Sequence, residues 1–178
     1  MHRLFVALRP PAPIRAQLIA LMHGVEGARW QDDAQIHITL RFIGEVDHHQ
    51  AGDIADALAR VAFPPLTLAL SGIGTFDRRG RIDTLWAGIA PVDQIGALHA
   101  KVDRACIAAG VAPDDRAYRP HVTMARFTRA GRLDGFLAAN AGLASPSFTV
   151  EEFGLYESRL GTGGAVYHLA ERYPLRAA

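Results

Sequence analysis

Two copies of a histidine–threonine tetrapeptide are the part of this sequence with the clearest chemical potential. The first copy is His37-Ile38-Thr39-Leu40, and the second, 84 residues further on, is His121-Val122-Thr123-Met124. Side chains alternate between the faces of a strand, so each histidine shares a face with the threonine two positions later, about 6–7 Å along the strand. If the two strands lie side by side, two imidazoles and two hydroxyls surround one small volume.

These four side chains suit the acid–base transfer of a phosphoryl group. Histidine titrates near neutral pH, so one imidazole can accept a proton from water while the other donates a proton to the leaving oxygen. The hydroxyls of Thr39 and Thr123 can donate hydrogen bonds to phosphate oxygens without adding charge. A five-membered cyclic phosphate is a strained ester with its leaving group attached, and on this interpretation its opening needs no metal ion.

Two other functions are compatible with the same residues. His37, His121 and a carboxylate could bind a metal, because histidine is a common ligand. However, the sequence has no His-x-x-x-His or His-Glu-x-x-His spacing, and neither tetrapeptide has an acidic residue beside it. We therefore predict no metal and no cofactor. The second alternative is a nucleotide- or RNA-binding module that keeps phosphate affinity without useful turnover.

The segments around the tetrapeptides predict strands and helices arranged in two similar halves. The expected strands are 4–8, 36–43, 66–70, 83–89, 121–127, 148–156 and 166–170. The expected helices are 12–22, a segment from Asp47 to before Pro64, 95–109 and 133–139. Runs of adjacent strands favour antiparallel sheets with helices on one side, an α+β fold that forms a single domain over residues 1–178.

Composition and charge exclude several classes of protein. A net charge of +1 with 49% hydrophobic residues suits a globular domain and excludes a strongly basic nucleic-acid coat. Cys106 is the only cysteine, so no intramolecular disulfide can form. The apolar run 4–8 stops after five residues, too short for a signal peptide or a membrane span. We expect a soluble, cytoplasmic monomer without membrane contact.

The tetrapeptides and their surroundings resemble the two-histidine phosphoesterase superfamily. Within it they are similar to the bacterial and archaeal RNA 2′,3′-cyclic phosphodiesterases, historically called 2′-5′ RNA ligases. The resemblance spans nearly the whole chain and rests on residues 3–8, 37–46, 85–89, 119–126, 153–158 and 167–169. Met124 is a mild departure, since Leu or Ile is commoner there.

The resemblance implies a bilobal, pseudo-two-fold-symmetric fold with the two motifs facing each other across a central cleft. It implies that His37 is the proton donor to the ribose 3′-oxygen, that His121 is the proton acceptor that activates water, and that Thr39 and Thr123 bind the phosphate. The product would be a 2′-phosphomonoester, and the reverse reaction would make a 2′-5′ RNA linkage. The implied partners are RNA ends or small nucleotides that carry a 2′,3′-cyclic phosphate.

Three further side chains are candidates for substrate binding. Phe42 and Arg126 each lie five residues after a motif histidine, and both types stack on bases, so pseudo-symmetry suggests that they hold a nucleobase between them. Strict alternation puts both on the face opposite the histidines, so this hypothesis requires a bulge, twist or strand end. The same alternation places Arg41 on the catalytic face, near the phosphate. We interpret the arginine-rich turn 78–81 as a solvated loop, with substrate binding as the alternative.

Overall fold

The computed structural model describes residues 1–162 and 164–177, and in that part of the chain it contains nine strands, four α-helices and one short 3-10 helix. The strands are β1 (His2–Leu8), β2 (Arg29–Trp30), β3 (Ile38–Val46), β4 (Leu66–Arg78), β5 (Arg81–Ala90), β6 (His121–Arg126), β7 (Phe148–Val150), β8 (Glu152–Gly161) and β9 (Gly164–Pro174). The helices are α1 (Ala12–Leu21), η1 (Asp33–Gln35), α2 (His48–Leu58), α3 (Val92–Ala108) and α4 (Asp134–Ala139).

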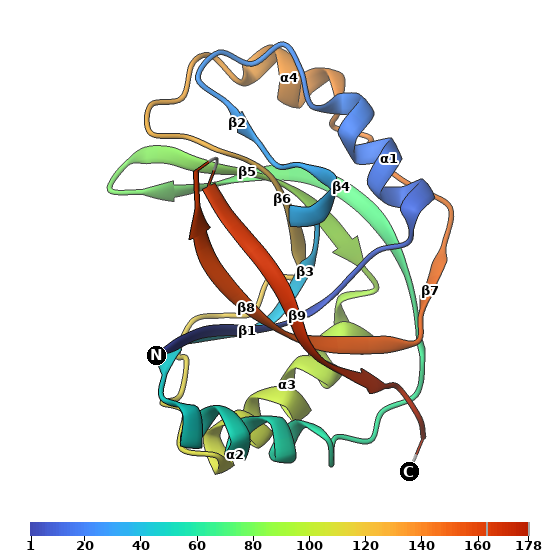
Figure 1. Cartoon of the computed structure of the whole chain (residues 1–178). Helices are drawn as coiled ribbons and strands as arrows, with labels where there is room; N and C mark the ends of the chain where they lie inside the picture. The colour runs from blue at the N-terminus through green and yellow to red at the C-terminus, as the bar shows by residue number, and fades with distance from the viewer. Residues whose placement is uncertain (163, 178) are drawn as a thin grey trace.

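All the strands pair antiparallel in one sheet, in the order β7-β4-β5-β6-β3-β1-β8-β9, with β2 on β6. The two strands that carry the tetrapeptides, β3 and β6, are neighbours at its centre. Figure 1 shows α2 and α3 at one end of the molecule and α1 and α4 at the other, with the strands between them. We call β3, β1, β8 and β9 with α2 and α3 the β3 lobe, and the remainder the β6 lobe. The expected α+β fold is confirmed.

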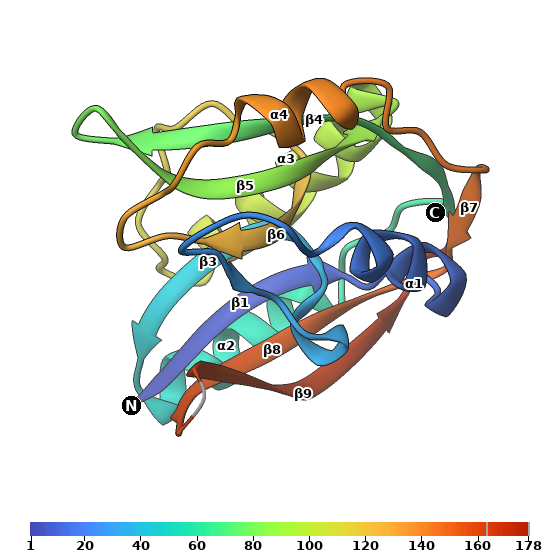
Figure 2. The same ribbon diagram turned by 90° about the horizontal axis from the view of Figure 1, so that it is seen from above.

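Neither lobe is a continuous stretch of chain. In the β3 lobe, β1 from the N-terminal end pairs with β8 near the C-terminal end, from Leu4 opposite Glu157 to Ala7 opposite Gly154. Directly after β1 the chain crosses to α1, which lies at the end of the molecule formed by the β6 lobe (Figures 1 and 2). The lobes are therefore interleaved along the sequence.

The caps explain where α2 begins and where α3 ends. Asp47 accepts a hydrogen bond from the backbone N–H of Gln50 at 2.8 Å, which fixes the start of α2. The Gln50 side chain does not complete a capping box, because its amide donates to the Gly110 carbonyl at 3.1 Å. Gly110 has a φ of 85°, the left-handed conformation that ends α3. One side chain thus ties the start of α2 to the end of α3.

Several boundaries differ from the sequence-based expectation. β3 begins at Ile38 rather than at 36, because η1, which starts with a full capping box between Asp32 and Gln35, occupies residues 33–35 just before it. α2 ends at Leu58, earlier than expected. β4 and β5 extend to Arg78 and Arg81, so the predicted arginine turn is the tip of one long hairpin, which projects from the body in Figure 2.

The buried core lies on the side of the central strands that faces the helices. Ile38, Leu40, Val122 and Met124, the apolar positions of the two tetrapeptides, are each at most 1% exposed. Burial of such side chains fixes which face of each strand points away from the core. Among the described residues no helix is both long and apolar enough to cross a membrane.

Candidate active site

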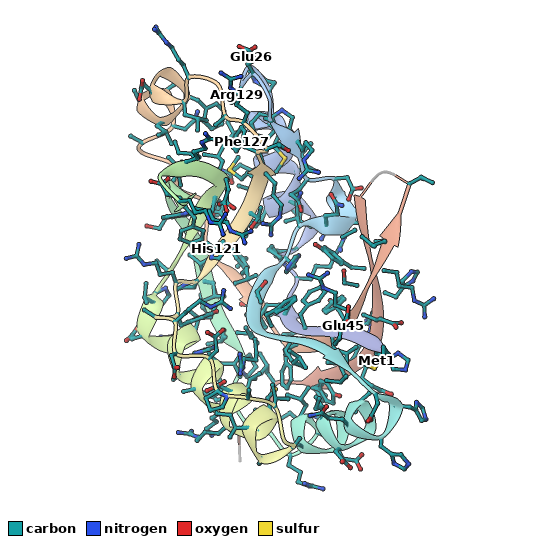
Figure 3. The ribbon with its side chains drawn as sticks, turned by 90° about the vertical axis from the view of Figure 1, so that its left-hand side faces the viewer. Met1, Glu26, Glu45, His121, Phe127 and Arg129 are labelled. Carbon is teal, nitrogen blue, oxygen red and sulfur yellow. The ribbon has the colours of Figure 1, made fainter. Side chains whose placement is uncertain are left out.

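The two tetrapeptides meet where β3 pairs with β6, at Ile38 opposite Val122. Both of these side chains point into the core, so the flanking histidines and threonines share the other face of the sheet. The antiparallel register places each motif histidine beside the threonine of the other motif. Figure 3 shows His121 midway along the molecule, with the chain running from it towards Phe127. The structure therefore brings the four predicted side chains together.

The backbone fixes the proton position on both imidazoles. Nδ1 of His37 lies 2.6 Å from the carbonyl oxygen of Gln35, and Nδ1 of His121 lies 2.6 Å from that of Arg119. A carbonyl oxygen only accepts hydrogen bonds, so each Nδ1 is the donor and each Nε2 remains for chemistry. In His37, Nε2 lies 3.1 Å from the Thr39 hydroxyl.

Burial keeps both imidazoles neutral near pH 7. The pKa of His37 is lowered to about 4, mainly by burial, against the raising effect of the hydrogen bond to the Gln35 carbonyl; the charges of Arg126 and Arg9, and that of His121 when it is protonated, contribute to the lowering. Burial also lowers the pKa of His121, with a smaller contribution from Arg126. A neutral imidazole is a proton acceptor at Nε2. For either histidine to be protonated near pH 7, a negative charge must lie close to its ring.

Aromatic rings surround both histidines and account for this burial. The ring centroids nearest to His37 are those of Phe5 at 4.9 Å and Tyr167 at 5.2 Å, and those nearest to His121 are Phe76 at 4.9 Å and Trp86 at 6.2 Å. Phe5 lies on β1 and Trp86 on β5, the strands that flank the central pair. The two lobes thus support their histidines in the same manner.

A bulge at Leu40 reverses the alternation of β3 after its tetrapeptide. Thr39 lies opposite Ala7 of β1, but Arg41 lies opposite Val6, so Leu40 is an extra residue. Neighbouring residues of β1 point to opposite faces, and Thr39 and Arg41 therefore do so too. Phe42, opposite Phe5, returns to the catalytic face.

A matching bulge at Met124 acts in the same way on β6. Thr123 lies opposite Trp86 of β5, and Arg126 lies opposite Thr84, with Met124 as the extra residue. Trp86 and Thr84 share a face, so Arg126 lies on the catalytic face with Thr123. These two bulges are the irregularity that the substrate-binding hypothesis for Phe42 and Arg126 required.

Phe42 and Arg126 nevertheless lie at opposite ends of the catalytic face. β3 and β6 run antiparallel from their shared pair, so Phe42 lies towards His121 and Arg126 towards His37. Phe42 is 42% exposed and lines a cleft of about 650 Å³ together with Thr39, Tyr118 and His121. Arg126 does not line this cleft but an adjoining groove. The arrangement does not place one nucleobase between these two side chains.

Arg41 does not take the predicted position beside the phosphate. The bulge turns it to the core side, where it is 4% exposed. Its guanidinium forms ion pairs with Asp103 at 2.7 Å and Asp114 at 3.3 Å, and it donates to the Ala112 carbonyl. The alternation that predicted a catalytic-face position stops at Leu40. Arg41 instead ties β3 to α3 and to the loop that leads to β6.

Two residues that sequence reasoning missed hold the Leu40 bulge. The Tyr118 hydroxyl donates to the Thr39 carbonyl at 3.0 Å, and Nδ1 of His99 donates to the Leu40 carbonyl at 2.7 Å. The two rings stack with centroids 4.0 Å apart and an interplanar angle of 4°. No local pattern marks either residue, because their partners lie 79 and 59 positions away in the sequence.

The described residues do not assemble the alternative metal site. In residues 1–162 and 164–177 no three His, Cys, Asp or Glu side chains gather closely enough to bind a metal ion. His37 and His121 therefore have no carboxylate arranged with them as a ligand set in that part of the chain.

Comparison with known proteins gives consistent matches over most of the chain. The family model described as LigT-like phosphoesterase matches twice, at residues 8–86 and 89–167, which agrees with two similar halves. An RNA 2′,3′-cyclic phosphodiesterase of Aeropyrum pernix is 31% identical over 83% of this chain and 85% of its own length. One of Escherichia coli K12 is 29% identical over 98% and 97%. The crystal structure of E. coli LigT complexed with 3′-AMP superposes with a TM-score of 0.81 at 28% identity, covering 98% of both chains.

Proposed function

We propose, because the chain belongs to the LigT-like phosphoesterase family, that it hydrolyses 2′,3′-cyclic phosphates at RNA ends to 2′-phosphomonoesters. The relatives named above carry the name RNA 2′,3′-cyclic phosphodiesterase. The observation that supports this activity most directly is the pairing of Ile38 with Val122, which gathers two imidazoles and two hydroxyls on one face. That set provides both proton transfers of the reaction and the hydrogen bonds that hold its phosphate.

In the proposed reaction, water attacks the phosphorus atom while Nε2 of His121 accepts its proton. The bond between phosphorus and the 3′-oxygen breaks, and the departing oxygen takes a proton from Nε2 of His37. Thr39 and Thr123 donate hydrogen bonds to the non-bridging oxygens, where negative charge increases. Because each Nδ1 donates to a backbone carbonyl, the Nε2 atom of each histidine is left to exchange a proton with the substrate or with water.

The substrate itself supplies the charge that makes His37 a proton donor. Burial lowers the pKa of His37 to about 4, so its protonated form is a stronger acid than an ordinary imidazolium. A phosphodiester anion in contact with Nε2 stabilises the imidazolium and raises this pKa. Protonation of His37 is thus coupled to binding of the phosphate.

The cleft beside His121 is the proposed site of the terminal nucleoside. Phe42 offers an exposed aromatic face there, and base–aromatic stacking contributes about 1–3 kcal/mol. The E. coli LigT structure complexed with 3′-AMP supports a nucleotide-sized ligand in this family. Arg41 has no part in this proposal because its guanidinium is held by Asp103 and Asp114.

The reaction can be followed by ³¹P NMR with an oligonucleotide that ends in a 2′,3′-cyclic phosphate, in the presence of EDTA. We expect a 2′-phosphate product from the wild type, and a loss of about 10²–10⁴-fold in kcat for His37→Ala and His121→Ala. His23→Ala, an exposed histidine outside the site, is the matched control. Folded wild-type protein that binds the oligonucleotide without turnover would contradict the proposal and support a binding module.

The roles of the two histidines can be separated with a p-nitrophenyl phosphodiester, whose leaving group departs without protonation. We expect His37→Ala to regain most of its lost activity on this ester, because a proton donor is no longer needed. His121→Ala should remain inactive, because water still requires a base. Rescue of His121→Ala instead would reverse the assignment.

A further inference from the structure

A groove of about 550 Å³ beside the active site is lined by five arginines. They come from three elements, and all are exposed: Arg29 on β2, Arg78, Arg79 and Arg81 on the β4–β5 hairpin, and Arg126 on β6. The chain has a net charge of only +1. Five of its 19 basic side chains line this one groove.

The arginines of this groove face one another instead of carboxylates. Arg29 lies directly opposite Arg126 in the β2–β6 pair, and Arg78 lies directly opposite Arg81 in the hairpin. In residues 1–162 and 164–177, none of the five lies within ion-pair distance of an acidic side chain, whereas six other arginines do. Like charges directly opposite each other destabilise a sheet. A bound polyanion would remove that repulsion.

The groove adjoins the cleft that Thr39 and His121 of the catalytic face line. Arg78 and Asp83 line both hollows, and Arg126 lies close enough to His37 and His121 to lower the pKa of each. Asp83 is the one carboxylate on the groove wall, and its Oδ1 accepts a hydrogen bond from the Thr84 hydroxyl at 2.9 Å. A chain of phosphates that ends at the motif histidines can therefore pass along the arginines.

We propose that this groove, with Arg78, Arg79 and Arg81 at its outer end, binds the sugar–phosphate backbone of the RNA strand that precedes the cyclic phosphate. The proposal rests on the proposed function, and it names the substrate class as an oligonucleotide rather than a mononucleotide. Guanidinium groups pair with phosphate oxygens through two parallel hydrogen bonds. Such contacts position a strand without reading its sequence, so the binding is independent of base sequence.

The first test measures binding alone. A fluorescent oligonucleotide that ends in a 2′-phosphate is titrated with the full-length protein at several salt concentrations. Each phosphate contact to a single strand contributes a slope of about −0.7 to the plot of log affinity against log salt. We expect the double variant Arg79→Gln with Arg81→Gln to reduce this slope by about 1.4, for oligonucleotides of any sequence.

The matched control removes the same charge at the far end of the molecule. Arg60→Gln with Arg104→Gln changes two exposed arginines at the end of α2 and on α3, and it should leave the slope unchanged. An equal loss in this control would mean that net charge, not the groove, governs binding. Equal displacement of the oligonucleotide by an acidic peptide of the same charge would overturn the assignment to a nucleic-acid strand.

The second test uses turnover to connect the groove with catalysis. For the Arg79→Gln and Arg81→Gln protein, whose two arginines line only the groove, we expect a raised KM on an oligonucleotide substrate, with kcat and mononucleotide turnover within twofold of the wild type. Equal losses on both substrates, or an unchanged KM on the oligonucleotide, would overturn the proposal. If the wild type turns over neither substrate, the proposed function fails, while the binding test still decides whether the groove holds a strand.

Discussion

At the residue scale, the chemistry depends on how each imidazole is held rather than on its presence. The carbonyl of the residue two positions earlier fixes Nδ1 of both His37 and His121, at 2.6 Å in each case. An aromatic ring packs beside each imidazole, with centroids 4.9 Å apart in both cases. His99, by contrast, uses its Nδ1 to hold a backbone bulge, so its imidazole has a positioning role. Sequence alone identified the first pair through the repeated tetrapeptide.

The pH dependence of turnover follows from these surroundings. In the free enzyme the pKa values of His37 and His121 are both below the ordinary 6.5, and the mechanism requires one protonated histidine. We expect kcat/KM to decrease with rising pH already from a pH below 6.5, because the proton donor is deprotonated there in the free enzyme. A bound phosphate anion raises the pKa of the donor, so kcat should decrease only at a higher pH.

Both profiles can be measured between about pH 4 and 9 with one cyclic phosphate substrate. The His23→Ala protein should reproduce the wild-type curves. If kcat and kcat/KM decrease over the same alkaline pH range, phosphate binding is not coupled to protonation of the donor, and this prediction is wrong.

At the element scale, two bulges separate what the sequence could predict from what it could not. Periodicity located β3, β6 and the face that carries the four motif side chains, because burial of Ile38 and Val122 fixes that face. It failed beyond Leu40 and Met124, since an extra residue in a strand leaves no mark in an alternating pattern. For this reason Arg41 was assigned to the wrong face.

The role of Tyr118 in holding the Leu40 bulge can be tested by the variant Tyr118→Phe. This change removes the hydrogen bond to the Thr39 carbonyl and leaves the ring that stacks on His99. We expect kcat to fall roughly tenfold with little change in KM, because Thr39 and the following strand lose their position. The free energy of unfolding should fall by only about 1 kcal/mol.

Tyr173→Phe is the matched control for this variant. Its hydroxyl donates to the Ala55 carbonyl at 3.3 Å, in a buried position away from the cleft. The control should show a comparable change in stability and a wild-type kcat. If the two variants lose kcat equally, Tyr118 contributes only to stability.

At the scale of the whole molecule, the active site exists only because the lobes are joined at their catalytic strands. β1 precedes α1 in the sequence but pairs with β8 near the other end of the chain, so each lobe needs both halves of the sequence. The family model matches each half separately, yet the halves do not correspond to separate lobes. We therefore predict that the chain is a single domain that unfolds as one unit.

This prediction can be tested by urea unfolding with two probes. The only tryptophans, Trp30 and Trp86, lie in the β6 lobe, whereas far-ultraviolet circular dichroism reports on both lobes. Leu155→Ala in β8 removes a side chain that is 3% exposed in the β3 lobe, and it should cost about 2–5 kcal/mol. Because the lobes unfold together, the fluorescence midpoint should fall with the dichroism midpoint. A tryptophan transition that stays at the wild-type urea concentration would mean that the β6 lobe is stable alone, and the single-domain prediction would then be wrong.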